Sequence, residues 1–272
     1  MLVFDARPLF PRERRALLDL LGSLGAAQWS APTVCPGWAV RDVVAHLLDD
    51  YLRRLSGSRD GYGGVPFAPG ESLPAYLARI NGEFVAAMRQ CSPSTMVDLL
   101  THLGPQLDEL WERTDPAGPA YLDVSWAGAG TSPAWLDCAR EYTEFWVHQQ
   151  QIRDAVGRPG ADEPELLRPV LVTFLHALPV ALSGFARPAG TAMSFEVTGP
   201  AGGRWVAVSD GTGWDLVDRA CENPVAAVRM DADTVWRLGS CGITVDEARR
   251  RTAATGDPEL TAAAATLLAV VA

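Results

Sequence analysis

The sequence predicts an α+β protein, with a four-helix bundle in its first half and a small α+β domain in its second half. Three observations lead to this prediction. Apolar residues recur at helical spacing through the first half, and short alternating stretches separated by glycine follow in the second half. Between them, the segment 157–165 (GRPGADEPE) is rich in glycine, proline and acidic residues. We therefore place a domain boundary there, with domains at 1–160 and 161–272.

The bundle is expected from long apolar-periodic segments joined by turn-forming loops. In the segment WAVRDVVAHLLDDYLRRL, for example, apolar residues form the stripe of an amphipathic helix. We expect helices at 12–29, 38–55, 75–90, 94–113 and 134–157. The longest loop among them, 56–74, is rich in glycine and proline and long enough to be functional or mobile.

Several residues are expected to set the ends of these helices. The pair Gly104 and Pro105 is expected to break or kink the fourth helix. Thr131 or Ser132 is expected to cap the last helix, with Pro133 as its first residue. Gly157 then follows the last turn, where a left-handed residue commonly ends a helix.

The second half begins with a helix at 165–182, which is expected to break near Pro179. Three alternating segments at 191–199, 204–210 and 213–218 then predict an antiparallel meander. Strand and helix patterns return over 222–250, and the apolar end of the chain, 260–272, is expected to be a docked C-terminal helix.

The composition argues against several classes of protein. Lys and Arg number 23 and Asp and Glu 33, so the formal net charge of −10 disfavours a nucleic-acid binder, which needs a basic surface. We see no secretory signal and no uninterrupted apolar run long enough for a bilayer. The five scattered cysteines form no C-x-x-C pair, which indicates neither a disulfide framework nor a cysteine zinc site. We therefore expect a cytoplasmic protein without a membrane or nucleic-acid partner.

Three residues that commonly bind metals lie on the polar faces of two predicted helices. Glu144 and His148 are four residues apart, so they share one face of helix 134–157. His46 lies off the apolar stripe of helix 38–55. Two imidazoles and a carboxylate bind Zn²⁺ or a similar divalent ion and leave positions open for water and substrate. The pattern alone leaves two interpretations: solvated histidines on separate surfaces, or polar faces that line a shared, water-filled cleft.

Two signatures contain these residues. In PTVCPGWAVRDVVAHLLDD, a Pro-Gly-Trp turn enters a helix with the pattern Val-Arg-Asp-x-x-x-His-Leu, and EYTEFWVHQQQIRDAVGRP combines Glu-x-x-x-His with an Ala-x-Gly-x-Pro end. Both resemble the DinB-like, mycothiol-dependent maleylpyruvate isomerase family. The matching residues are Pro36, Gly37, Trp38, Val40, Arg41, Asp42, His46 and Leu47, then Glu144, His148, Ala155, Gly157 and Pro159. The C-terminal segments VRMDADTVWRLGSCGITVDEARRR and DPELTAAAATLLAVVA resemble the sterol-carrier-like domain of that family.

The resemblance implies a DinB-like, metal-binding bundle followed by a sterol-carrier-like α+β domain. It implies that His46, Glu144 and His148 are the metal ligands and that the cofactor is the low-molecular-weight thiol mycothiol. A metal ion stabilises the thiolate over the thiol, and the thiolate is the nucleophile. The chain departs from the family in Gln149–Gln151, where His or Asp often stands. These glutamines leave the metal set intact, and we expect this region to orient the ligands, while the substrate and the isomerase step stay open.

Other polar residues are candidates for supporting roles. Asp42 and Asp50 lie one turn on either side of His46 and would act in the second shell or as surface charges. Glu141 is a candidate fourth ligand or base, and Asn81 a candidate cleft residue. Arg153 would bind a substrate carboxylate or form an exposed salt bridge.

Cys35 precedes a helix, where a thiolate is stabilised, but no histidine follows at a diagnostic spacing, so we interpret it as a packed turn residue. We assign no catalytic residue from the sequence.

The resulting hypothesis is a metal-dependent, mycothiol-using transferase or isomerase that acts on a small electrophile, with Zn²⁺ as the expected ion. One alternative is a metal-dependent hydrolase on the same scaffold, in which the ion activates water. A second alternative is a small-molecule-binding module without catalysis. The substrate, the identity of the metal and the oligomeric state are left open by the sequence.

Overall fold

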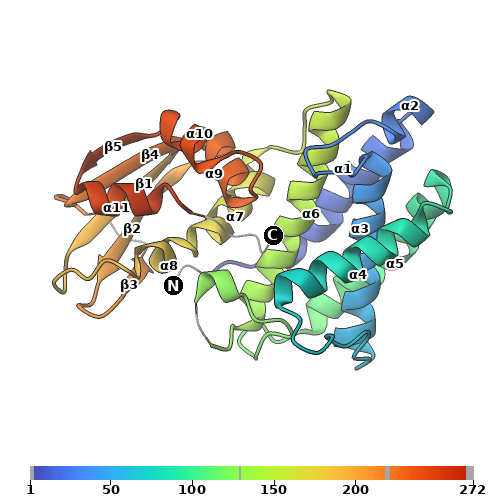
Figure 1. Ribbon diagram of the computed structural model, residues 1–272, viewed down its shortest axis with the longest axis horizontal. Helices are drawn as coiled ribbons and strands as arrows, with labels where there is room; N and C mark the ends of the chain where they lie inside the picture. The colour runs from blue at the N-terminus through green and yellow to red at the C-terminus, as the bar shows by residue number, and fades with distance from the viewer. Residues whose placement is uncertain (1–2, 129, 218–220, 268–272) are drawn as a thin grey trace.

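The computed structural model describes residues 3–128, 130–217 and 221–267. The chain forms two lobes that lie side by side, a helical lobe and a lobe built on a sheet (Figure 1). The expected α+β fold class is therefore confirmed. The helical lobe comprises the 3-10 helix η1 (Arg7–Leu9), α1 (Phe10–Gly22), α2 (Ala26–Trp29), α3 (Val40–Arg54), the π-helix η2 (Leu55–Arg59), α4 (Leu73–Met88), α5 (Pro93–Arg113), the 3-10 helix η3 (Ser125–Ala127) and α6 (Ala134–Val156).

Four of these helices enclose the core of the bundle. Helix α1 packs on α5 and α6, and α3 packs on α5 and α6 from another side. The apolar stripe predicted for α3 is buried, as Val43, Val44, Leu47 and Leu48 are fully inaccessible. Helix α4 lies against α3 and buries only Ile80 and Val85. The α3–α6 interface is the part of the fold that matters for the site.

The predictions about helix ends had mixed outcomes. Helix α5 runs unbroken through Pro105, so the predicted break was wrong, while a kink stays a prediction; Arg14 of α1 packs against Gly104, where a Cβ would collide with its side chain. Tertiary packing thus outweighs the local cost of proline. Helix α6 has no side-chain cap: Pro133 itself is the N-cap, and the Ser132 hydroxyl accepts a hydrogen bond from Val124 instead. Gly157 does end α6 in the left-handed conformation, as predicted.

The second lobe contains α7 (Pro164–Leu175), α8 (Leu178–Leu182), β1 (Ala192–Thr198), β2 (Gly203–Ser209), β3 (Trp214–Val217), β4 (Ala226–Asp231), α9 (Ala232–Gly239), α10 (Val245–Arg250), β5 (Ala253–Gly256) and α11 (Pro258–Ala264). Its sheet has the order β3-β2-β1-β4-β5. The predicted meander is confirmed, since β1, β2 and β3 pair antiparallel, while β4 joins β1 in parallel. Residue 218 of the predicted third strand lies outside the described residues.

The predicted C-terminal helix is present in part. Helix α11 packs on α8 and β4, and its Leu260 and Ala264 are fully buried. The expected docking of this end of the chain therefore holds for the described residues. Residues 268–272, which the same prediction covered, lie outside them.

Helix α7 joins the two lobes. It packs on α6 on one side and on α9 on the other, and the Tyr142 hydroxyl donates a hydrogen bond to the Leu166 carbonyl. The segment Pro164–Leu182 is long and apolar enough to cross a membrane by length and composition alone, and 61% of its most apolar window is buried in the protein. The division of domains at residue 160 stays a prediction.

Candidate metal centre

The structure brings the three predicted ligand residues together between α3 and α6. The ligand atoms of His46, Glu144 and His148 all lie within 4.8 Å of one another. Glu144 Oε1 lies 3.4 Å from His46 Nε2 and 3.1 Å from His148 Nε2. The histidine residues are only 5% and 9% exposed. The interpretation of solvated histidines on separate surfaces is therefore wrong, because the polar faces of the two helices meet inside the bundle.

The geometry of these atoms suits one divalent ion. Ligands about 2.0–2.1 Å from a tetrahedral ion are separated by roughly 3.4 Å, which is close to the two distances above. Two imidazole nitrogens and one carboxylate oxygen are donors that Zn²⁺ and several other divalent ions accept. The three side chains thus supply a donor set that fits a divalent ion, with all three ligand atoms within 4.8 Å of one another.

His148 is held by groups that the sequence placed far apart. Its Nδ1 donates a hydrogen bond of 2.7 Å to Gln151 Oε1, and the Cys35 thiol donates to the same oxygen at 3.2 Å. With Nδ1–H bonded to Gln151, Nε2 is the nitrogen that faces Glu144, where it carries a proton or, once that proton is displaced, offers its lone pair to a metal ion. The expected orienting role of the glutamine region is confirmed for Gln151. The contact of Cys35 was missed, because only the tertiary fold brings residues 35 and 151 together.

The other two glutamines face away from the site. Gln149 donates hydrogen bonds to the side chain and the carbonyl of Glu13, and Gln150 donates to the carbonyls of Gly160 and Ala161. They tie α6 to α1 and to the segment before α7. At positions 149 and 150, where the chain departs from the family pattern, the glutamines therefore link elements of the fold and do not contact the site.

In the metal-free protein, a proton takes part in balancing the charge of the site. Burial raises the pKa of Glu144, but hydrogen bonds and charge from His148 and His46 hold it well below its ordinary value. Burial lowers the pKa of His148, while contacts with Cys35 and Glu144 outweigh this and raise it to about 10. The Glu144 carboxylate and the protonated His148 thus form an ion pair. A metal ion that binds here has to displace the proton of His148.

Asp50 and Asn81 lie near the site in different ways. Asp50 Oδ2 lies 3.6 Å from His46 Nε2, and Asp50 Oδ1 accepts a hydrogen bond from Arg53 at 2.9 Å. Asn81 of α4 accepts from the same Arg53 nitrogen at 2.8 Å. Asp50 is thus a neighbour of the ligands, whereas Asn81 reaches them only through Arg53 and Asp50.

Asp42 contacts none of the three ligand residues through its hydrogen bonds. It is 4% exposed, accepts a hydrogen bond from the Ala39 backbone nitrogen at 3.0 Å and pairs with Arg89. Burial raises its pKa, but Arg89 and the Ala39 amide lower it below the ordinary value. It closes the first turn of α3, so neither surface charge nor a second-shell role describes it.

Glu141 and Arg153 are both engaged by groups outside the cluster, and the substrate contact considered for Arg153 stays a prediction. Arg54 of α3 donates hydrogen bonds to both oxygens of Glu141, so this carboxylate is occupied by a guanidinium and is no fourth ligand. Arg153 donates to Gln149 Oε1 at 3.0 Å and to the carbonyls of Ala16 and Arg158. It joins α6 to α1 away from the candidate ligands. Helical spacing placed both residues near the site, but neighbouring helices engage them first.

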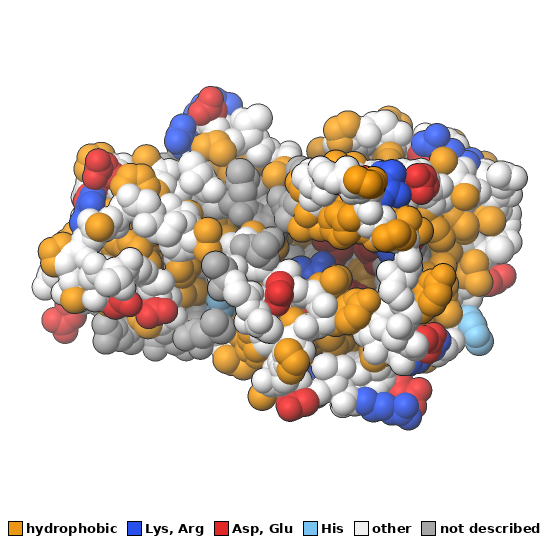
Figure 2. All heavy atoms as spheres, turned by 60° about the horizontal axis from the view of Figure 1, so that its bottom comes forward, with side chains coloured by type: hydrophobic (Ala, Val, Ile, Leu, Met, Phe, Trp, Pro, Cys, Tyr) orange, Lys and Arg blue, Asp and Glu red, His pale blue; other side chains and the backbone are white. Residues whose placement is uncertain are grey.

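A hollow opens on the bundle half of the face drawn in Figure 2, with acidic and basic side chains inside it. Glu144 is the most accessible of the three candidate ligands, with 31% of its side chain exposed. The two imidazoles are buried, which strengthens charge interactions, while the carboxylate is partly exposed to solvent.

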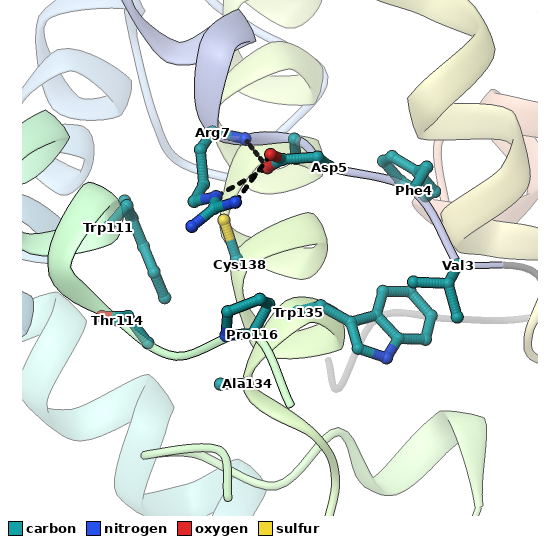
Figure 3. A pocket seen from close by; sticks show the side chains of 11 residues that line it. Val3, Phe4, Asp5, Arg7, Trp111, Thr114, Pro116, Ala134, Trp135 and Cys138 are labelled. Atoms are coloured by element: carbon teal, nitrogen blue, oxygen red, sulfur yellow. Dashed lines mark hydrogen bonds and ion pairs between the residues drawn. The ribbon is translucent and has the colours of Figure 1, made fainter. Parts of the chain in front are cut away.

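A second, apolar cavity of about 260 Å³ lies elsewhere, between the N-terminal segment and the start of α6 (Figure 3). Trp135, Phe4 and Cys138 line it, and its charged groups Asp5 and Arg7 pair with each other. Burial raises the pKa of Cys138, which keeps that thiol protonated. None of the predicted site residues lines this cavity, so we place the chemistry in the α3–α6 interface.

Fold and site together define a class: a helical bundle with a His₂–carboxylate cluster, joined to a mixed five-stranded sheet domain. The model of the mycothiol maleylpyruvate isomerase N-terminal domain matches residues 10–153, more than half of the chain, so the chain belongs to that family. The match covers the whole of the first signature and the Glu144–His148 part of the second, but not its end at Ala155, Gly157 and Pro159.

Known proteins resemble the chain beyond this domain. Crystal structures of a mycothiol-dependent maleylpyruvate isomerase and of a histidine-to-alanine variant of it superpose with TM-scores of 0.53 and 0.52. They are 16% and 14% identical and the matches cover 85% of this chain and 86% of each of theirs, which establishes the likeness of fold across both lobes. Uncharacterized proteins from two strains of Mycobacterium tuberculosis are 28% identical over 189 residues, 68% of this chain and 70% of theirs.

Proposed function

We propose that this protein is a metal-dependent enzyme that uses mycothiol to attack a small electrophile, as an isomerase or an S-transferase. The observation that carries the proposal is the convergence of His46, Glu144 and His148 between α3 and α6, with the Glu144 side chain 31% exposed. Membership of the family and the fold of a mycothiol-dependent maleylpyruvate isomerase support it. Zn²⁺ is the ion that we propose, because the donor set consists of two imidazoles and a carboxylate.

Each residue of the proposed site would have a separate role. His46 Nε2, Glu144 Oε1 and His148 Nε2 would hold the ion, and the ion supplies a positive charge that stabilises the cofactor thiol as a thiolate. Gln151 keeps His148 in the tautomer whose Nε2 faces the ligands. The buried position of both imidazoles excludes competing water from one side, while the exposed edge of Glu144 leaves access for thiol and substrate.

The first test is the metal content of protein purified without a metal-affinity tag, measured by elemental mass spectrometry. We expect about one equivalent of metal in the wild type and loss of it in His148→Ala. His102→Ala is the matched control, because His102 is an exposed histidine of α5. No metal in the wild type, even after incubation with Zn²⁺, would refute the proposed metal site.

The second test separates the reactions that such a site supports. Metal-loaded protein is incubated with maleylpyruvate and other small electrophiles, with and without mycothiol, and adducts and isomers are followed by chromatography. Turnover that requires the thiol supports the proposal. Turnover of an ester or amide that persists without any thiol would instead identify a hydrolase, and binding without turnover a non-catalytic module.

The place of action is a further part of the proposal. All five cysteines are free thiols, with Cys138 buried and Cys241 exposed. Free thiols persist in a reducing compartment, where a low-molecular-weight thiol is also in its reduced form. We therefore propose the cytoplasm, which fractionation with an antibody against the chain would test.

A further inference from the structure

The carboxylate of Asp50 has one oxygen whose surroundings are incomplete. Its Oδ1 accepts a hydrogen bond from Arg53, but Oδ2 is buried and receives none from the residues that the structure describes. This oxygen lies 3.6 Å from His46 Nε2, without the geometry of a hydrogen bond. A buried carboxylate oxygen without a donor is costly, so a cation or donor is expected beside it.

The position of Asp50 repeats the arrangement of the known candidate ligands. On α6, Glu144 and His148 are four residues apart, and on α3, His46 and Asp50 are four residues apart. Each helix therefore presents one imidazole and one carboxylate on a single face. The 3.6 Å separation of Asp50 Oδ2 and His46 Nε2 is close to the 3.4 Å between His46 Nε2 and Glu144 Oε1.

We propose that Asp50 is a fourth protein ligand, so that two imidazoles and two carboxylates hold the ion. This inference rests on the metal site of the proposed function. Asp50 is outside the set of three whose ligand atoms lie within 4.8 Å of one another, so coordination requires its side chain to turn toward them. Arg53, which Asn81 of α4 holds in turn, fixes the other oxygen and orients the carboxylate.

A fourth protein ligand changes the chemistry of the site. Two carboxylates balance the charge of a divalent ion, whereas Glu144 alone leaves a net positive charge. An ion with four protein ligands has to accept a fifth or sixth ligand when the thiol binds, which Zn²⁺, Fe²⁺, Ni²⁺ and Mn²⁺ do to different degrees. The identity of residue 50 thereby affects which ion serves best.

Asp49 offers a matched control. It is the neighbouring carboxylate on α3, it is 4% exposed, and its Oδ2 lies 3.1 Å from the same Arg53 nitrogen. Within the described part of the chain, Asp49 forms no hydrogen bond or ion pair with His46, Glu144 or His148. Like Asp50 Oδ2, Asp49 Oδ2 is buried without a hydrogen-bond donor among the described residues, and its ion pair with Arg53 lacks the hydrogen bond that Asp50 Oδ1 receives. D49N therefore controls for the loss of a buried carboxylate oxygen without a donor beside Arg53.

The experiment uses the full chain loaded with Co²⁺, whose absorption bands report coordination number and ligand type. We expect D50N to weaken Co²⁺ and Zn²⁺ binding at least about 10-fold and to alter the Co²⁺ spectrum, since even groups behind the ligands change affinity by ~10–100-fold. D49N is expected to change neither beyond about twofold. In D50C, a thiolate-to-cobalt charge-transfer band should appear that D49C and the wild type lack.

The outcomes distinguish this inference from the proposed function. If the wild type binds metal but D50N keeps its affinity and spectrum, and D50C shows no charge-transfer band, Asp50 is only the partner of Arg53 and the inference is overturned. D50C also answers the question if D50N is unstable, because the band reports direct contact. If the wild type binds no metal at all, the proposed function fails, and the inference fails with it.

Discussion

The interface between α3 and α6 contains two clusters of buried acidic residues that differ in what neutralises them. At one end, Arg54 donates hydrogen bonds to both Asp137 and Glu141, and all three side chains are at most 6% exposed. At the other end, Glu144 faces two imidazoles, and Asp50 keeps an oxygen without a donor. The chain completes the first cluster with Arg54, whereas at the second Arg53 donates to Oδ1 of Asp50 and, among the described residues, no arginine donates a hydrogen bond to Glu144 or to Asp50 Oδ2.

This difference shows how one pair of helices serves both stability and function. A buried carboxylate needs a cation or a proton, because its transfer from water is costly. Arg54 meets this need at the first cluster, and a proton on His148 or a bound metal ion meets it at the second. Glu13 of α1 is a third case: it has no guanidinium bonded to it, and burial raises its pKa to about 7 although Gln149 donates a hydrogen bond to it.

The largest effect is expected where the arginine is removed. Arg54→Met would leave Asp137 and Glu141 buried beside Arg140 alone, and loss of one partner of a buried ion pair costs about 3–5 kcal/mol. Urea unfolding followed by tryptophan fluorescence would measure this loss.

Arg113→Met is the control, since the Arg113–Glu109 pair on α5 is 77% and 56% exposed. Such an exposed pair is expected to contribute less than about 1 kcal/mol. Equal stability of the Arg54 and Arg113 variants would contradict the view that the arginine cluster stabilises the fold.

Glu13→Gln tests the comparison of the buried carboxylates through the pH dependence of the free energy of unfolding. The pKa of Glu13 is raised from 4.5 to about 7 in the folded protein. Below pH 4.5 the carboxyl is protonated in both states, and as pH rises to about 7 only the unfolded state releases the proton, so stability falls by about 3 kcal/mol. We expect Glu13→Gln to match the wild type near pH 4.5 and to be more stable at pH 8. Parallel pH profiles of the two proteins, measured by urea unfolding, would exclude this assignment.

Metal addition tests whether the second cluster lacks only a cation. An ion that binds only the folded state at 100 times its Kd stabilises that state by about 2.7 kcal/mol. We therefore expect Zn²⁺ to raise the Tm of the wild type but not that of His148→Ala, in scanning calorimetry at pH 7.5. The Arg54 cluster needs no ion, so Zn²⁺ should raise the Tm of Arg54→Met by as much as that of the wild type and leave the cost of the substitution unchanged. A larger gain in Arg54→Met than in the wild type would contradict the distinction between the clusters.

The smallest expected effect concerns the group behind His148. Gln151→Leu removes the acceptor for Nδ1 and is expected to weaken metal binding by about 10–100-fold, or ~1.4–2.7 kcal/mol. Gln150→Leu is the matched control, because Gln150 lies on the same helix but bonds the carbonyls of Gly160 and Ala161. Competition with a chromophoric chelator measures both; equal affinities would show that Gln151 does not orient the ligand.

Much of the site followed from local patterns, and the errors have a common cause. The spacing of Glu144 and His148 and the signature around His46 identified three residues that the structure brings together. The same reasoning also named Glu141, which is on the same stretch of α6, as a candidate ligand or base, because it did not include Arg54 of α3. It also missed the contact of Cys35 with Gln151, two residues separated by 116 positions in the chain.

The sequence by itself determined the helices, the meander and the pairing of Glu144 with His148, because these depend on local periodicity and on the geometry of a single helix. Only the tertiary structure decided that the polar face of α3 meets that of α6, and which carboxylates receive an arginine. Those outcomes depend on packing between segments that are distant in the sequence. Burying a charged side chain is costly unless another segment supplies an oppositely charged group beside it. Arg54 beside Glu141 and His46 beside Glu144 are the two results of that packing.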